Sequence, residues 1–375
     1  MPDKPEIQWV PKPIELPAVS ETRSSLIARA RKDLSKLSAA YSIAAPASVD
    51  RAPEDENEDP FMLGLRYETG EDVPQDYERA AFWYRRAAEQ GDGLAQNNLA
   101  ALYEEGKGVT QSFELAAFWY QKAAEQGDAG AQGNLGLLYE SGNGVPRDHS
   151  VAAGWYCAAA AQFTESPFQD YERAAFWYRK AAELGDPCAE FHLGQLYEIG
   201  QGVSQDYIVA ATWYERSATH GERHAQFSLG RLFAEGLGIP ASPERAAFWY
   251  KRSADQGNAY AQLELGRLYR DGVGVPASGH EAANWMERAI GNAPNDILKT
   301  AEYELGRLCL GRADVNGSYE KAYFWLYLSA QPPMEETAFA EARDVAAAKL
   351  KPSEILRLRE EADRWLRGRP EVLFC

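Results

Sequence analysis

Cysteine and histidine are scarce in this sequence. Its 375 residues include five histidines and four cysteines, Cys157, Cys188, Cys309 and Cys375, with no CxxC pair. Structural zinc sites and disulfide frameworks need such residues in pairs at regular spacing. The sequence therefore predicts no metal site, and it predicts reduced thiols, three of them within helices.

Long apolar runs and an excess of positive charge are missing too. No run of about 18 apolar residues occurs, which argues against membrane insertion. The first residues show no basic segment followed by an apolar one, so a cytoplasmic location is expected, with signal-less secretion left open. The formal net charge of −17 repels phosphate backbones and argues against a nucleic-acid partner.

Signatures of catalysis are also absent. The sequence has no Gly-x-Ser-x-Gly elbow, and its carboxylates occupy periodic positions typical of solvated helix faces. Its Gly-x-Gly pairs recur regularly, so turn geometry explains them better than phosphate binding. His220 and His224 flank Gly221 at an inter-helix junction and do not share a helical face. We therefore predict no catalytic residue, no cofactor and no enzyme activity.

Tryptophan, in contrast, recurs with a regular period. The series comprises Trp83, Trp119, Trp155, Trp177, Trp213, Trp249, Trp285 and Trp325. The steps along it are 36, 36, 22, 36, 36, 36 and 40 residues. A Leu-Gly-x-x-Tyr pattern or a near variant precedes each tryptophan except Trp177. A period of this length indicates an array of stacked structural repeats.

Each unit is predicted to contain two helices. In residues 95–130, Leu99 and Tyr103 share one helical face, and the loop glycines that follow end this first helix. The second helix carries a stripe of alanine and aromatic residues and ends at a glycine such as Gly127. Its predicted N-caps are Asp76, Ser112, Asp148, Asp170, Asp206, Ser242, Ser278 and Ser318.

Over residues 59–336 the sequence resembles the Sel1-like repeat family, a relative of tetratricopeptide repeats. Residues 95–130, 225–260 and 261–290 match its pattern A-x3-L-G-x-L-Y-x2-G-x-G-V-x2-D-x2-K-A-x2-W-Y-x-K-A-A-x-Q-G closely. The resemblance implies an all-α fold, an α/α solenoid wound as a right-handed superhelix, with a concave surface and no single activity. Secreted members with lactamase-like activity carry paired cysteines in each repeat, which this sequence lacks.

The pattern divides the sequence into four parts. Residues 1–58 are predicted to form a mobile arm with at most one helix. Repeats follow over 59–162 and, after a shortened unit, over 163–336. Residues 337–375 are predicted to add two charged capping helices. In the shortened unit, the 22-residue step joins two second helices directly, which predicts a bend or break in the stack.

If the array resembles tetratricopeptide repeats, the first helix of each unit lines the concave face. Before the shortened unit, small and acidic residues occupy this face, among them Gly133 and Glu140. After that unit, the predicted peptide-binding positions are Phe191, Gln195, Phe227, Arg231, Leu263, Arg267, Arg270, Tyr303 and Arg307.

Arg231, Arg267 and Arg307 recur at one position of successive units, and they are predicted to form a ladder. Beside aromatic rings, such a ladder can bind an acidic, aromatic peptide. Alternatively, the arginines pair with neighbouring carboxylates such as Glu235, Glu264 and Asp271.

The leading functional prediction is a bacterial protein-interaction scaffold or adaptor that binds a partner protein or peptide in the groove. An effector or a toxin-immunity protein that acts by binding is the alternative, and gene neighbourhood would separate the two. A lactamase-like or cell-wall-binding protein is the third prediction, which a convergent, buried polar pocket would favour.

Overall fold

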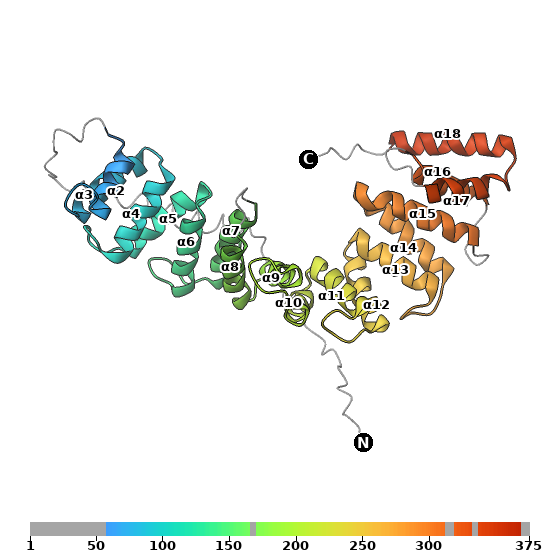
Figure 1. The fold of residues 1–375 in the computed structure, drawn as a ribbon, viewed down its shortest axis with the longest axis horizontal. Coiled ribbons are helices and arrows are strands. Elements are labelled where there is room, and N and C mark those ends of the chain that lie inside the picture. The colour runs from blue at the N-terminus through green and yellow to red at the C-terminus, as the bar shows by residue number, and fades with distance from the viewer. Residues whose placement is uncertain (1–57, 166–169, 312–318, 332–336, 369–375) are drawn as a thin grey trace, which may run out of the picture. The chain divides into compact units, whose positions relative to one another are not determined.

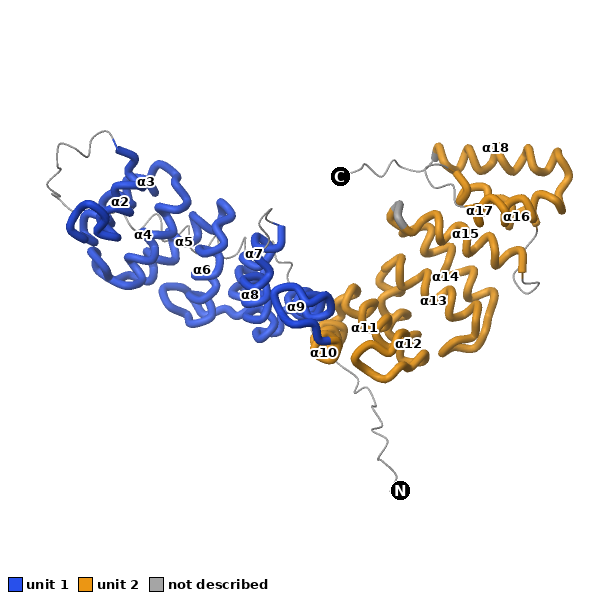
Figure 2. The backbone as a smooth tube through the Cα atoms, in the orientation of Figure 1, with its two compact units in different colours: residues 1–206 blue, residues 207–375 orange. Residues whose placement is uncertain are grey.

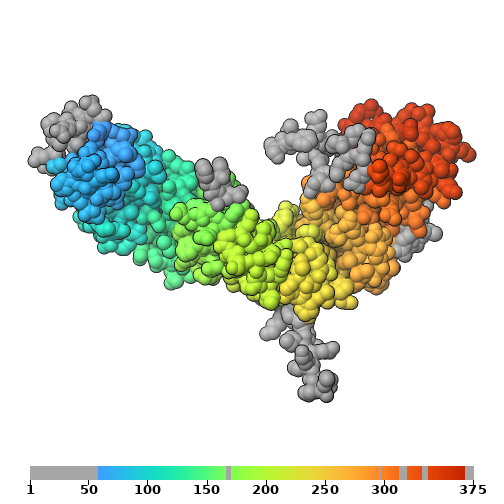
Figure 3. All heavy atoms as spheres, viewed as in Figure 1, coloured from blue at the N-terminus to red at the C-terminus, as the bar shows by residue number. Residues whose placement is uncertain are grey.

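The computed structural model describes residues 58–165, 170–311, 319–331 and 337–368, and every regular element within these ranges is an α-helix (Figure 1). Most of the predicted arm, the cap Ser318 and the last seven residues lie outside the described residues. The chain forms two compact units, residues 1–206 and 207–375 (Figure 2). Within each unit, the colours of the space-filling view follow one another along the surface in chain order (Figure 3).

The first unit consists of α2 (Pro60–Thr69), α3 (Tyr77–Glu89), α4 (Gly93–Glu105), α5 (Phe113–Glu125), α6 (Ala129–Ser141), α7 (His149–Glu165), α8 (Tyr171–Glu183) and α9 (Pro187–Ile199). The second consists of α10 (Tyr207–Thr219), α11 (Arg223–Glu235), α12 (Pro243–Asp255), α13 (Ala259–Asp271), α14 (Gly279–Asn292), α15 (Asn295–Gly311), α16 (Tyr319–Ser329), α17 (Thr337–Ala347) and α18 (Pro352–Gly368). No described helix combines the length and apolar character that crossing a membrane requires.

The predicted hairpins are confirmed, and alanine, leucine and tyrosine form their core. Leu99 of a first helix is fully buried, and Tyr120 of the following second helix is 1% exposed. The small residue after the leucine allows close packing, because a Cβ at Gly136 would lie 2.5 Å from the Tyr156 ring. Burying these faces removes apolar surface from water at about 25 cal/mol per Å², which holds each hairpin together.

Six of the eight predicted side-chain caps begin their second helices as expected. The carboxylate or hydroxyl of Asp76, Ser112, Asp148, Asp170, Ser242 and Ser278 accepts a backbone N–H of the first turn. The cap's own N–H donates back to the last aromatic residue of the first helix, as from Asp76 to the Tyr67 carbonyl at 2.8 Å. Each cap therefore fixes both where the second helix starts and how it turns away from the first.

Buried tyrosines connect the two helices of a hairpin by donating to glutamates. The Tyr120 hydroxyl donates to Glu104 Oε2 at 2.8 Å, and Tyr84 and Tyr156 make the same bond to Glu68 and Glu140. Burial of the ring, and then the nearby Glu104 carboxylate, raise the pKa of Tyr120 above its ordinary value of 10.0. The hydroxyl therefore stays protonated as a donor.

This raised pKa predicts a loss of stability in alkali. Because the unfolded tyrosine ionises first, the stabilisation is complete below pH 10 and falls as the pH rises above it. We expect the free energy of unfolding, measured in urea, to drop between about pH 8 and about pH 11. Tyr120→Phe should lower it by about 1.5–3 kcal/mol at the lower pH and make the drop smaller. An unchanged drop would contradict this role of Tyr120.

Helix α7 accounts for the 22-residue step between tryptophans. It has 17 residues, against 13 in α5 and α8, and it packs on both α6 and α8. The Asp170 N–H donates to the Phe163 carbonyl at 3.0 Å, as the Ser112 N–H does to Tyr103 at 2.9 Å. Phe163 thus takes the place of the tyrosine of a regular first helix. As predicted, two second helices, α7 and α8, follow each other directly. In addition, α7 serves as the first helix of the hairpin that it forms with α8.

Sharing α7 brings a second helix beside a first helix. Trp177 of α8 packs against α6, where a Cβ at Gly133 would lie 2.3 Å from its ring. Lys180 Nζ lies 3.7 Å from Glu140 Oε2 on the same two helices. Both Gly133 and Glu140 were predicted to line an open first-helix face. The prediction is wrong for Gly133, which is buried, whereas the Glu140 side chain remains 31% exposed. In this unit α8 contacts the first-helix face of α6 at these two positions, whereas Leu137 on the same helix is 39% exposed.

On the opposite side, α9 lies beside α7. The Cys157 thiol of α7 donates to Oδ1 of Asp186, the N-cap of α9, at 3.5 Å. Each helix from α6 to α9 packs on the next one. The array therefore accommodates the shortened unit by sharing one helix, and no gap opens between these helices. The division of the repeats at 162/163 stays a prediction, and the boundary between the compact units lies between Asp206 and Tyr207.

Candidate functional site

The predicted groove residues fall in both units, and those of the first unit lie on α9. Phe191 and Gln195 are both half-buried. The Phe191 ring lies 5.2 Å from the His192 ring, and Gln195 Oε1 lies 3.0 Å from His192 Nδ1. Gln195 also lines a cavity described below.

In the second unit, α11 and α13 present the next predicted residues. The Phe227 ring lies 5.9 Å from the ring of Tyr260, which is 39% exposed. Arg231 forms an ion pair with Glu235 one turn along the same helix, at 3.3 Å. For Arg231, pairing with a neighbouring carboxylate is therefore what the structure shows.

Two predicted residues are less accessible than the repeat pattern suggested. Leu263 is only 4% exposed because it belongs to the core formed with α14 and α15, so its placement in an open groove is corrected. Tyr303 is half-buried, and the Phe339 ring of α17 stacks on it at 4.3 Å. The capping helices thus cover part of the predicted face, which no repeat motif indicates.

Two of the arginines share one carboxylate from the next first helix. Glu304 of α15 lies 3.1 Å from Arg267 Nη2 and also pairs with Arg270. Arg267 bonds Glu264 at 2.6 Å, and Arg270 bonds Asp271 at 2.7 Å. The hydrogen bond to Asp271 and the charge of Glu304 raise the pKa of Arg270, against the effect of burial. Of the three arginines of the predicted ladder, only Arg267 therefore belongs to this network, which links α13 to α15.

Arg307 differs from the other arginines. It is exposed, its guanidinium lies 5.7 Å from the centre of the Tyr303 ring, and it forms no ion pair with a described residue. A cavity of about 380 Å³ lies beside it. Its lining residues are Arg270, Asp271, Glu304, Arg307, Leu308 and Gly311. In this cavity, carboxylates hold the guanidinium of Arg270, whereas the guanidinium of Arg307 forms no ion pair with a described residue.

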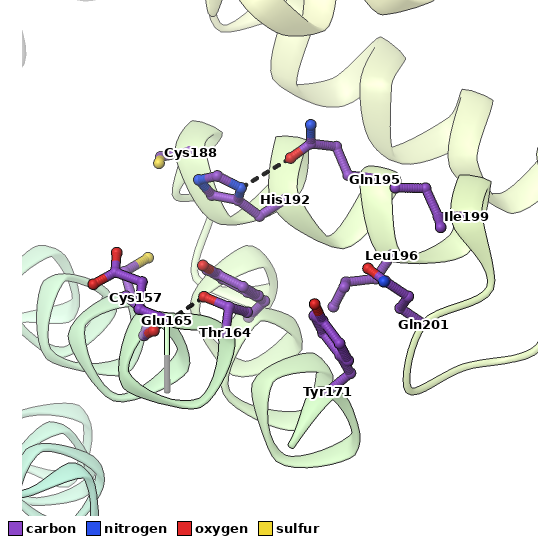
Figure 4. Close-up of a pocket in the computed structure, with 12 residues that line it drawn as sticks. Cys157, Thr164, Glu165, Tyr171, Cys188, His192, Gln195, Leu196, Ile199 and Gln201 are labelled. Carbon is purple, nitrogen blue, oxygen red and sulfur yellow. Dashed lines mark hydrogen bonds between the residues drawn. The ribbon is translucent and has the colours of Figure 1, made fainter. Parts of the chain in front are cut away.

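A second cavity, of about 320 Å³, lies in the first unit among α7, α8 and α9 (Figure 4). Cys157 and Cys188 line it together with His192, Glu165 and the predicted Gln195. Sequence reasoning missed this site, because nothing in the repeat pattern places α7 next to α9. The signal that could have found it is the coincidence of the shortened step with two cysteines 31 positions apart.

Neither cavity has the ligands of a metal centre. Within the described ranges, no group of three or more His, Cys, Asp or Glu side chains is placed to hold a metal ion. His220 follows the end of α10 and His224 lies in α11, with Gly221 at φ 96° between them. What the two sites offer is charge, hydrogen bonding and thiol chemistry.

Comparison with protein-family models finds Sel1 repeats at residues 61–92, 93–128, 129–162, 166–186, 189–222, 223–258, 259–292 and 299–331. The fourth match is the shortened repeat that begins after the shared helix α7. Together the eight segments cover most of the chain, including both units.

Several solved structures are similar to this chain. A Sel1 repeat protein from Oxalobacter formigenes is 31% identical over 75% of this chain and 100% of its own, with a TM-score of 0.40. A protective antigen of uropathogenic Escherichia coli is 26% identical over 84% and 88%, with a TM-score of 0.31. An immunity protein from Pseudomonas aeruginosa is 18% identical over 78% and 84%, with a TM-score of 0.23. No curated protein matches. On the eight matched repeats and the helical hairpins that form them, the chain belongs to the Sel1 repeat family.

Proposed function

We propose that this chain is a protein-interaction scaffold that binds an acidic, aromatic peptide on the first helices of its second unit. Sel1 repeats commonly serve as protein-interaction scaffolds. The observation that carries the proposal is Arg307, an exposed guanidinium without an ion pair to any described residue, at the edge of a cavity of about 380 Å³. In a chain of net charge −17, such a cation favours a partner carboxylate.

The surrounding network supports this role by holding the cavity in shape. Glu304, whose side chain is 14% exposed, fixes Arg267 and Arg270 on the neighbouring helix. A partner carboxylate that enters the cavity therefore meets the guanidinium of Arg270, which its neighbours already order. It also meets the guanidinium of Arg307, whose charge it neutralises. Because less side-chain entropy is lost on binding, such pre-organisation favours affinity. The exposed ring of Tyr260 and the ring of Phe227 offer an apolar surface on α11 and α13.

Replacing Arg307 with glutamate tests this proposal. The full chain is titrated with fluorescein-labelled peptides of acidic and aromatic residues, and binding is followed by fluorescence anisotropy. Arg307→Glu should weaken binding of the best peptide at least about tenfold, since hydrogen bonds to charged groups contribute about 1.5–3 kcal/mol. Added salt should weaken the wild-type interaction as well.

Arg288→Glu is the matched control. Arg288 lies on the second helix α14 with its guanidinium 4.2 Å from the centre of the Trp285 ring, so it combines the same charge change with a similar aromatic contact. Binding should be unchanged in this variant. Equal losses in both variants would indicate a general charge effect, and unchanged binding in Arg307→Glu would remove the proposed site.

A further inference from the structure

We infer that Cys157 and Cys188 form a dithiol site in the first unit, which a low-molecular-weight disulfide oxidises to an internal disulfide. The two thiols come from different helices, α7 and α9, and they line one cavity of about 320 Å³ (Figure 4). Cys157 is 3% exposed, whereas Cys188 is exposed. This site is independent of the proposed peptide-binding surface, which lies in the second unit.

The register of the shared helix places the two cysteines opposite each other. Cys157 lies six positions before Phe163, as Asn97 lies six before Tyr103. Cys188 lies nine positions before Tyr197, as Gly130 lies nine before Tyr139. Since Phe163 takes the place of Tyr103, the pair Cys157 and Cys188 corresponds to the pair Asn97 and Gly130 of regular neighbouring first helices.

In that regular pair, a side chain at position 130 would come close to Asn97. A Cβ at Gly130 would lie 4.0 Å from Asn97 Oδ1 and 3.3 Å from Oδ1 of Asp128, the N-cap of its helix. In the second unit, the corresponding residues Phe227 and Tyr260 have ring centres 5.9 Å apart. Side chains at these two positions therefore approach each other in both units. A disulfide requires in addition that the two Cβ atoms lie about 3.5–4.5 Å apart.

The position of the Cys157 thiol relative to α9 is given by its hydrogen bond to Asp186. The Cys157 thiol donates to Asp186 Oδ1 at 3.5 Å, so it lies at the N-cap of the helix whose second residue is Cys188. By the register above, this carboxylate oxygen corresponds to the one that would contact a Cβ at Gly130. The inferred disulfide therefore requires α7 to move toward the start of α9 until the two sulfurs meet.

The reaction proceeds by two thiol–disulfide exchanges. The exposed Cys188, as thiolate, attacks one sulfur of the small disulfide RSSR, which forms a mixed disulfide and releases one RS⁻. Cys157 then loses its proton to solvent and attacks the Cys188 sulfur, which releases the second RS⁻. One RSSR is reduced to two thiols, and one disulfide joins α7 to α9.

The full chain carrying Cys375→Ser tests the site with glutathione disulfide as the probe. After non-reducing tryptic digestion, we expect the peptides 148–173 and 181–216, which contain the two cysteines, to appear joined. Two glutathione molecules should be released per chain. Cys309 is the internal control: burial raises the pKa of its thiol to about 11, so it should stay reduced.

Two single variants separate the steps of the reaction. In Cys157→Ser, the reaction should stop at the glutathionyl adduct on Cys188. The amount of this adduct should be at least about tenfold higher than in the parent chain, because there the Cys157 thiol displaces glutathione at a high effective concentration. Cys188→Ser, at an exposed position, should form neither product at Cys157. Circular dichroism checks that both variants remain helical. A parent chain that retains the adduct, stays reduced or links another cysteine would overturn the inference.

Discussion

Replacing Gly108 with alanine is expected to lower the free energy of unfolding of the first unit by more than about 3 kcal/mol. Gly108 has φ 67°, a left-handed conformation that costs an alanine about 1–2 kcal/mol by itself. In addition, the new Cβ would lie 2.1 Å from the carbonyl group of Tyr77, at the start of α3. Since the obstacle is backbone in a packed helix, it cannot rotate away. Urea unfolding followed by circular dichroism measures the loss.

Gly91→Ala is the matched control for this prediction. Gly91 also has a positive φ, of 100°, but a Cβ there would meet no atom within 4 Å. Only the conformational cost of about 1–2 kcal/mol is expected. If the two variants lose equal stability, crowding against Tyr77 is not the reason for the glycine at 108.

The second large effect is expected where Trp177 of α8 contacts α6. Gly133→Ala should destabilise the chain by about 1–3 kcal/mol or more, because its Cβ would lie 2.3 Å from the Trp177 ring. In a Trp177→Ala background, the same change should become stabilising by up to about 1 kcal/mol, since alanine then replaces glycine within a helix without a clash. A double-mutant cycle in urea measures this reversal of sign.

Gly136→Ala provides the control on the same helix. Its Cβ would meet Tyr156 of α7 at 2.5 Å rather than Trp177. Removing Trp177 should therefore leave the cost of Gly136→Ala unchanged. Equal relief at positions 133 and 136 would contradict the specific contact between α6 and α8.

Much of the fold could be predicted from the sequence because its determinants are local. A cap such as Ser112, a left-handed glycine such as Gly106 and a buried leucine such as Leu99 each act within one helical turn. Each of these signals recurs at the same place in successive units, so the helix boundaries predicted for one unit are supported by those of the next. The helical hairpins and their family follow from such signals alone.

The candidate sites depended on contacts that no local signal reports. Glu304 pairs with Arg267 from a helix 37 positions away, and Phe339 of a capping helix stacks on Tyr303. Leu263 sits on a predicted groove position, yet the neighbouring hairpin buries it. The charge of each arginine could be read from the sequence, whereas its partner depends on how successive hairpins stack.

The shared helix α7 has a consequence for how such arrays change in length. First and second helices lie on opposite sides of the array, so losing a whole hairpin leaves every later helix, and every motif on it, on its original side. Losing a single helix exchanges the two sides, as the placement of α9 beside α7 demonstrates within the first unit. A deletion of one helix can thus present an unchanged later motif on the opposite face, which creates a different surface without any substitution in the remaining residues.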